Sequence, residues 1–310
     1  PMFSKDIVKQ YVKPILEQDK NVCLLVVDCM RHDHFKAMMP LLEQFYTIDL
    51  SYMFSLLPTA TPYSRNAIFC GMYPDEMVTN YPEQASDMEE DASSLNRHEK
   101  QFLLDQLETL GLGHKSMHYH KIWAVQEGKK FQNRIKDYAQ QDLLALVVNF
   151  VDILAHKSSQ TEVLKEMVPD ESGYRTAVRS WLEHSWLLQV LKRLSENGWS
   201  VIMTSDHGSI RVQNDVMVAA DRNASSGVRY KFGRNLNTNE KNALIIKEPG
   251  HYRLPVFGPQ PSYIIAKDEN YFVYPNEAHK YQAKFKNSFQ HGGISMEEMM
   301  VPVAVMKGRG

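Results

Sequence analysis

Cysteine is scarce in this chain, and long apolar runs and an excess of one charge are absent. The 310 residues include only Cys23, Cys29 and Cys70, which is too few for a disulfide framework and indicates a reducing compartment. Lys and Arg number 35 and Asp and Glu number 37, so only a local basic cleft, not bulk charge, would attract nucleic acid. No apolar run reaches about 18 residues and the N-terminus has no signal-peptide segment, so we expect no membrane span and a cytoplasmic location.

Two kinds of apolar segment alternate along the chain, and their order predicts the fold. Continuous apolar runs, typical of strands buried in a parallel sheet, lead into Asp28, Asp152 and Asp206. Amphipathic segments with helical spacing separate these runs. We therefore predict an α/β fold with a doubly wound, mainly parallel sheet and helices on both faces. The expected strands are 21–28, 48–55, 115–120, 143–152, 199–208, 242–247, 262–266, 271–274 and 299–306, and the expected helices are 4–18, 96–111, 174–197 and a short one within 58–71.

We expect a single domain over residues 1–310, because this length is near the limit for one hydrophobic core. Two irregular segments, around 72–142 and 210–285, are expected to form a small cap or insertion. Ser4 is the expected N-cap of the first helix. Pro302 lies in the last expected strand and predicts an edge position there, because proline has no backbone N–H.

Carboxylates and imidazoles recur where the expected strands end. An open α/β sheet forms its active site at the carboxyl ends of its strands, so these side chains should meet there. A carboxylate and an imidazole four residues apart share one face of a helix, and this combination suits zinc. Each short motif taken alone is as well explained by surface polarity or by a turn. The ordered set, which supplies the predicted metal ligands, is Asp28, Asp152, His156, Asp206, His207 and His291.

Thr61 is the candidate nucleophile. It precedes Pro62 at the start of a short helix that closes at Gly71, so it would lie at the positive end of the helix. A bound metal ion could lower the pKa of its hydroxyl enough to generate an alkoxide. On the local sequence alone a plain helix cap is the better explanation of Thr61, and Thr59 is a rival nucleophile.

Several basic or amide side chains are candidates for substrate binding. In the Thr61 helix, Asn66 could donate to a phosphate oxygen and Arg65 could pair with one bidentately. Farther along, basic and aromatic residues alternate in the segment RYKFGR, which suits a phosphate backbone with stacked bases. A solvated basic loop is the alternative explanation for this segment. Its candidate substrate contacts are Arg229, Lys231 and Arg234.

These motifs, in this order, resemble the alkaline phosphatase superfamily and its PglZ branch. The first strand ends in VVD, and PTATPYSRNAIFCG matches a P-T-x-T…G pattern. In the nucleotide pyrophosphatase/phosphodiesterase branch the second Thr of this pattern is the nucleophile, ten residues before the Gly, and this spacing favours Thr61 over Thr59. The D-x-x-x-H, DHG and late His motifs then follow. RNAIFCG, VRYKFGRNL and QHGGIS are similar to the PglZ branch in particular.

The resemblance implies two Zn²⁺ ions. Asp152, His156 and His291 would hold one ion. The other ion would be bound by Asp28, Asp206, His207 and the oxygen of Thr61. Sulfatases of the superfamily have Cys or Ser at the nucleophile position, so Thr61 disfavours a sulfatase.

The implied function is that of a zinc-dependent phosphodiesterase with a Thr nucleophile, a phosphoric diester hydrolase acting on nucleotides or oligonucleotides, cyclic ones included. The chain resembles the effector (output) domain of PorX-type response regulators, two-component proteins linked to type IX secretion. That likeness implies a receiver domain in the full-length protein, and a homodimer is compatible with it. Two alternatives remain open at this point, a non-catalytic signalling effector with structural zinc and a phosphomonoesterase of the same superfamily.

Overall fold

The fold is known from a computed structural model, which describes residues 1–309 except 85–96, 158–165, 220–226 and 259–260. A six-stranded sheet in the order β2-β13-β5-β1-β4-β3 forms its centre. β13 runs antiparallel to both of its neighbours, and the pairs among β5, β1, β4 and β3 are parallel. The predicted α/β class with a mainly parallel sheet is therefore confirmed. The strands are β1 (Val22–Val27), β2 (Tyr46–Phe54), β3 (Met117–Ile122), β4 (Leu143–Val148), β5 (Ser200–Thr204) and β13 (Met300–Gly308).

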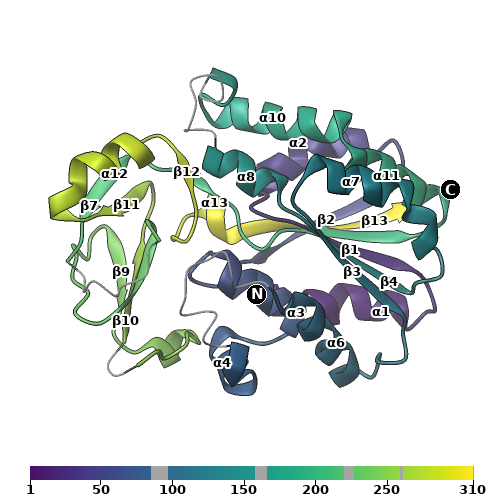
Figure 1. Ribbon diagram of the computed structural model, residues 1–310, viewed down its shortest axis with the longest axis horizontal. Helices are drawn as coiled ribbons and strands as arrows, with labels where there is room; N and C mark the ends of the chain where they lie inside the picture. The colour runs from purple at the N-terminus through teal and green to yellow at the C-terminus, as the bar shows by residue number, and fades with distance from the viewer. Residues whose placement is uncertain (85–96, 158–165, 220–226, 259–260, 310) are drawn as a thin grey trace.

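Helices cover both faces of this sheet, as Figure 1 shows. The strands contribute side chains to two hydrophobic cores, one on each face of the sheet, because successive side chains point to opposite faces. In β1, Cys23 and Leu25 belong to one core, whereas Leu24 and Val26 belong to the other. One face carries α2 (His32–Leu42), α7 (Val125–Asn133), η3 (Ile135–Tyr138), α8 (Phe150–Lys157), α10 (Glu171–His184) and α11 (Trp186–Glu196), and the other carries η1 (Ser4–Asp6), η2 (Val8–Val12), α1 (Lys13–Leu16), α3 (Thr61–Cys70), α4 (Pro74–Asn80) and α6 (Glu99–Thr109).

A second lobe lies beside the carboxyl ends of the parallel strands (Figure 1). It contains a three-stranded sheet, β8-β10-β9, and a two-stranded one, β11-β7, with α12 packed against β11. The short strands β6 and β12 pair where the chain leaves the main sheet and returns to it. The lobe contains β7 (Asn214–Met217), β8 (Tyr230–Gly233), β9 (Ala243–Ile246), η4 (Pro249–Tyr252), β10 (Ser262–Ala266), β11 (Asn270–Val273), η5 (Pro275–Glu277) and α12 (Ala278–Phe285), and β6 (Ile210–Arg211), β12 (Phe289–Gln290) and α13 (Met296–Met299) adjoin it.

Two helix predictions need correction. The expected helix 174–197 is two helices, because Ser185 has an extended backbone and its hydroxyl caps α11 by accepting from the Leu187 N–H. Apolar periodicity continues on both sides of this break, so periodicity alone did not reveal it. The first helix begins at Ser4, with Phe3 and not Ser4 in the N-cap position. Among the described helices, none is long and apolar enough to cross a membrane.

Two topological predictions are also wrong. Pro302 lies in β13, an interior strand between β2 and β5, and not at an edge. It is tolerated because the pairing of β13 with β5 ends at Val303, while the Pro302 carbonyl accepts from the Thr204 hydroxyl. Segment 72–142 is not a cap in its described part, because β3 is an edge strand of the central sheet and α6 packs on one face. Residues 85–96 of that segment lie outside the described part of the chain.

Candidate metal centre

The structure brings the six predicted ligand residues together as two adjacent groups. Asp28, Asp206 and His207 form an inner group, which is buried, with candidate ligand atoms within 4.8 Å of one another. Asp152, His156 and His291 form an outer group under the same distance limit. The rings of His207 and His291 stack with centroids 4.2 Å apart, so the two groups share a boundary.

Strand ends and turns position the inner group. Asp28 directly follows β1, and Asp206 and His207 follow β5, the neighbouring strand. The His207 Nε2 atom lies 3.6 Å from Asp206 Oδ2 and 3.8 Å from Asp28 Oδ1. The next residue, Gly208, must be glycine for close approach, because a Cβ there would lie 1.9 Å from the Glu297 carbonyl oxygen.

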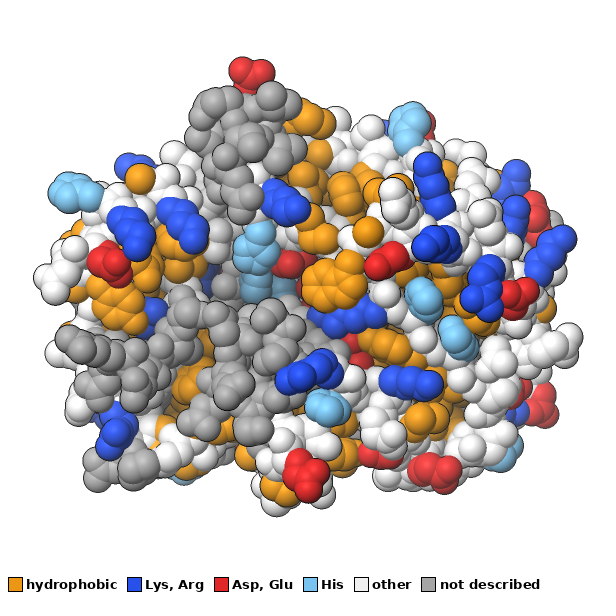
Figure 2. All heavy atoms as spheres, in the orientation of Figure 1, with side chains coloured by type: hydrophobic (Ala, Val, Ile, Leu, Met, Phe, Trp, Pro, Cys, Tyr) orange, Lys and Arg blue, Asp and Glu red, His pale blue; other side chains and the backbone are white. Residues whose placement is uncertain are grey.

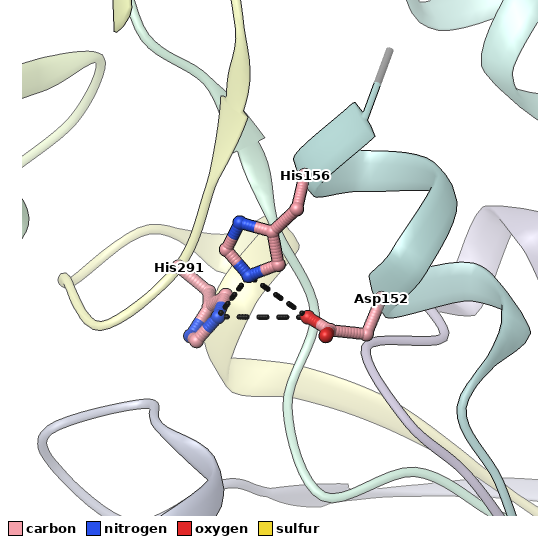
Figure 3. Close-up of side chains that lie close together, drawn as sticks. All are labelled: Asp152, His156 and His291. Atoms are coloured by element: carbon pink, nitrogen blue, oxygen red, sulfur yellow. Dashed lines mark hydrogen bonds and ion pairs between the residues drawn. The ribbon is translucent and has the colours of Figure 1, made fainter. Parts of the chain in front are cut away.

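The outer group combines α8 with the turn after β12 (Figure 3). Asp152 lies in the first turn of α8 and His156 one turn later, on the same face of the helix. The Asp152 Oδ1 atom lies 3.2 Å from His156 Nε2 and 3.6 Å from His291 Nε2. The side chain of His156 is 45% exposed, so this group opens towards solvent whereas the inner group does not.

Thr61 lies against the inner group. Its Oγ1 is 3.0 Å from His207 Nε2. It occupies the first turn of α3, whose N-cap is Ala60, so Thr61 is not the N-cap that the sequence suggested. Because α3 has no side-chain hydrogen bond at its N-cap, the explanation of Thr61 as a plain helix cap is wrong.

The inner carboxylates are suited to a cation. Asp28 Oδ2 accepts from Arg65 and Asn149, and Asp206 Oδ1 accepts from the Cys29 N–H. The other oxygen of each carboxylate is buried and has no hydrogen-bond donor among the described residues. Burial raises the pKa of Asp28 to about 8 although Arg65 opposes this, and burial also raises the pKa of Asp206. Buried carboxylates of this kind need a nearby positive charge.

The inner histidine is oriented for metal binding. His207 Nδ1 lies 3.0 Å from the Gly208 carbonyl oxygen, which can only accept a hydrogen bond. Nδ1 therefore carries the proton, and the lone pair of Nε2 points towards the carboxylates and Thr61. Such a hydrogen bond on the second ring nitrogen is the usual support of a metal-binding imidazole. The donor set of both groups, carboxylate oxygen and imidazole nitrogen, fits zinc.

The prediction that Arg65 contacts the substrate needs correction. Its guanidinium is buried, and it donates to Asp28 Oδ2 at 2.6 Å and to Glu99 Oε1 at 2.7 Å. Arg65 therefore holds one oxygen of a ligand carboxylate and leaves the other oxygen available. Glu99 is buried too, and it also accepts from the Tyr119 hydroxyl.

Two residues of the RYKFGR segment also need correction. Arg229 is fully buried and forms a two-pronged ion pair with Glu298, so its guanidinium is not available to a substrate. Lys231 is buried in the second lobe, where its ammonium donates to the Gly227 carbonyl and lies 4.7 Å from the centroid of the Tyr274 ring. This burial lowers the pKa of Lys231 to about 8.

The remaining substrate candidates stay predictions. Arg234 is exposed on the second lobe. Asn66 is buried in α3, and its amide donates to the Pro62 carbonyl at 3.0 Å.

Sequence reasoning missed several residues around the site. Asn149 donates to Asp28 at 2.9 Å, and it is the one strongly polar side chain within the apolar run that leads to Asp152, which was a usable signal. Glu99 gave no signal, because an acidic residue at a helix start is ordinary. Trp123 was also missed. Trp123 follows β3 at the same carboxyl end of the sheet as Asn149, whose N–H donates to the Ile122 carbonyl, and the residue is 54% exposed.

Comparisons with known proteins found a matching family model and similar solved structures. The family model described as the BREX system PglZ alkaline phosphatase-like domain matches residues 7–306. Among solved structures, the chain is similar to a murine ectonucleotide pyrophosphatase/phosphodiesterase 5, with a TM-score of 0.61 and 14% sequence identity. That similarity covers 92% of this chain and 88% of the murine one, and it shows an alkaline-phosphatase-like fold. The curated proteins include no match.

Proposed function

Because the chain belongs to the PglZ family of alkaline phosphatase-like domains, we propose that it is a phosphoesterase, and more narrowly a zinc-dependent phosphodiesterase with Thr61 as nucleophile. One observation carries the proposal, namely the contact of 3.0 Å between Thr61 Oγ1 and His207 Nε2 beside two groups of ligand residues. The diester preference is supported by the structural similarity to a protein that is named a phosphodiesterase.

The inner group, together with Thr61 Oγ1, would hold one zinc ion, and the outer group would hold the second. When bound, such ions lower the pKa of a hydroxyl or water and stabilise negative charge on the attacking and leaving oxygens. The carboxylates of Asp28 and Asp206 each keep one oxygen for this purpose, because scaffold hydrogen bonds occupy the other.

The residues of the chain bind and orient the phosphoryl group. The positive end of the α3 dipole, at Thr61, favours an anion there, although the Tyr63 and Ser64 N–H groups already donate to the Ala60 carbonyl and Pro62 has no N–H. Thr61 Oγ1 loses its proton to water and forms a bond to phosphorus, while the bond from phosphorus to the leaving oxygen breaks and that oxygen takes up a proton. The intermediate is then a diester of phosphate with Thr61 and the remaining substituent. Water forms a new bond to its phosphorus while the bond to Thr61 Oγ1 breaks, which releases a phosphomonoester and returns a proton to the Thr61 hydroxyl.

The rim of the site offers an aromatic surface for the substrate. Figure 2 shows a hollow on this face, with His and acidic side chains inside it and hydrophobic and basic side chains beside it. Lys121 Nζ lies 5.1 Å from the centroid of the Trp123 ring and 3.5 Å from Glu99. An exposed indole next to a cation suits a stacked base on a phosphate backbone, so the proposed substrates are nucleotide diesters, linear or cyclic oligonucleotides included.

The biological setting stays a prediction from the sequence. The proposal includes a role as the output domain of a response regulator linked to type IX secretion, with a receiver domain as the intramolecular partner and a homodimer as the assembly. The family match and the fold do not bear on the regulatory role, the receiver domain or the homodimer. A phosphomonoesterase and a non-catalytic effector are the competing outcomes of the experiment that follows.

The proposal is tested by comparing an aryl phosphodiester with the monoester of the same aryl group, using zinc-loaded protein. We expect a higher kcat/KM for the diester. A preference for the monoester would make the protein a phosphomonoesterase, and no turnover of either ester with zinc bound would favour a signalling role.

Trp123→Ala should raise the KM for an aryl or dinucleotide diester, because the variant loses a stacking surface worth about 1–3 kcal/mol per base. This corresponds to a rise of about fivefold or more, with unchanged zinc content. Tyr52→Ala is the matched control, because Tyr52 is similarly exposed (53%) but lies on β2, the opposite edge strand. An unchanged KM in Trp123→Ala would remove this residue from the substrate site.

A further inference from the structure

Three hydrogen bonds fix the turn that carries His291. The Thr59 hydroxyl donates to the Gly293 carbonyl at 2.8 Å and accepts from the Gly292 N–H at 3.2 Å. The Gly293 N–H donates to Glu298 Oε1 at 2.8 Å. A buried carboxylate therefore holds the backbone two residues after an outer-group histidine.

The second lobe supplies the ion-pair partner of the Glu298 carboxylate. Arg229 Nε donates to Glu298 Oε1 at 2.8 Å and Nη2 donates to Oε2 at 2.6 Å, and both side chains are fully buried. The guanidinium also donates to the Asn270 carbonyl of β11. It packs directly on the turn, because a Cβ on Gly293 would lie 2.1 Å from Arg229 Nη2. Any shift of Arg229 therefore changes the space that the His291 turn occupies.

Glu298 also reaches the turn of the inner group, through its backbone. The Gly208 N–H donates to the Glu298 carbonyl oxygen at 2.9 Å, directly after His207. One residue thus holds both histidine turns, the inner one by its main chain and the outer one by its side chain. A substitution of the Glu298 side chain can therefore disturb the outer group selectively.

The local sequence offers Glu298 a different role, which it does not adopt. Residues 295–298 read S-x-x-E, the signature of a capping box, in which the glutamate would accept from the backbone N–H of the serine. Ser295 does accept from the Glu298 N–H at 3.2 Å, but the carboxylate is bound to Arg229 and Gly293 instead. A buried ion pair is also not needed for stability alone, since apolar side chains of similar volume often replace one without loss.

We propose that the Arg229–Glu298 ion pair is a positioning device that sets His291 relative to Asp152 and His156, and so determines the metal affinity of the outer group. The inference rests on the proposed function, because it assumes that the outer group binds zinc. Arg229, the first basic residue of the RYKFGR segment, therefore acts on the metal site through the His291 turn and does not contact the substrate.

The test is zinc binding by the full chain, measured by competition with a chromophoric chelator. The double variant Arg229→Met, Glu298→Met removes the ion pair without leaving an unpaired buried charge. We expect two zinc ions in the wild type, and in the double variant one unchanged tight ion and one bound about 10–100-fold more weakly, the usual effect of losing support for a ligand. Arg229→Lys keeps the charge but loses the two-pronged geometry, so it should weaken the same ion less.

Arg253→Met is the matched control. Arg253 also joins the second lobe to the main sheet and its helices, through Asp75 and Glu76, but its side chain is 42% exposed and its ion pairs lie away from the His291 turn. We expect wild-type affinity for both zinc ions in this variant. If the double variant and Arg229→Lys both bind two zinc ions with wild-type affinity, this inference is overturned while the proposed function is not. A wild-type protein that binds no zinc would overturn the proposed function and this inference with it.

Discussion

Thr61→Val should lower kcat/KM for an aryl phosphodiester by at least about 1,000-fold, because valine has the shape of threonine but no hydroxyl to attack phosphorus. The fold should be unaffected. Ala60, and not Thr61, is the N-cap of α3, so the hydroxyl contributes no cap hydrogen bond. The expected result is a folded protein that retains zinc in the outer group and has lost turnover.

Two further substitutions separate the nucleophile from its neighbours. Thr61→Ser keeps a hydroxyl and should retain measurable turnover. Thr59→Val removes the hydroxyl that holds Gly292 and Gly293, so it should weaken metal binding through the His291 turn while zinc in excess restores turnover. Near-normal turnover in Thr61→Val, with loss in Thr59→Val under excess zinc, would make Thr59 the nucleophile.

Arg65→Met should destabilise the metal-free protein by about 3–5 kcal/mol, the usual cost of breaking a buried ion pair by removing one partner. The substitution leaves Asp28 and Glu99 buried without the guanidinium that now pairs with both. Zinc should recover part of this loss, because it can compensate Asp28 but not Glu99. The measurement is the free energy of unfolding in urea, with a chelator and then with zinc.

Arg253→Met is again the control, since its ion pairs are partly exposed to solvent and pairs near the surface contribute about 1 kcal/mol or less. A metal-free Arg65→Met protein as stable as the wild type would show that Arg65 does not stabilise the inner carboxylates.

The sequence predicted which carboxylates and imidazoles lie together, because strand ends are local features. Asp28 and Asp206 each follow an apolar run, and the topology of an α/β sheet requires such ends to meet. The ion-pair partners of Arg65 and Arg229 could not be predicted in this way. Which carboxylate a buried arginine pairs with depends on residues far along the chain, Glu99 and Glu298, that have no distinctive local pattern.

The helix error and the strand error have different origins. Ser185 interrupts an amphipathic pattern that continues without change on both sides, so the pattern did not reveal the break that its extended backbone and its cap on α11 make. Pro302 indicates an edge by its missing N–H, but an interior strand accepts it where the pairing with its neighbour has ended. For Pro302 the local chemistry was interpreted correctly and the neighbouring strands decided the result, whereas the capping role of Ser185 was missed.

The most direct test of the central claim is to withdraw the metal and return it in measured amounts. Protein stripped by a chelator should have no phosphodiester turnover, and activity should return as zinc is added, reaching its maximum when two ions are bound per chain. The inner group should fill first, because it is buried and the outer group opens to solvent. Full turnover by the stripped protein, or none with two zinc ions bound, would contradict the account.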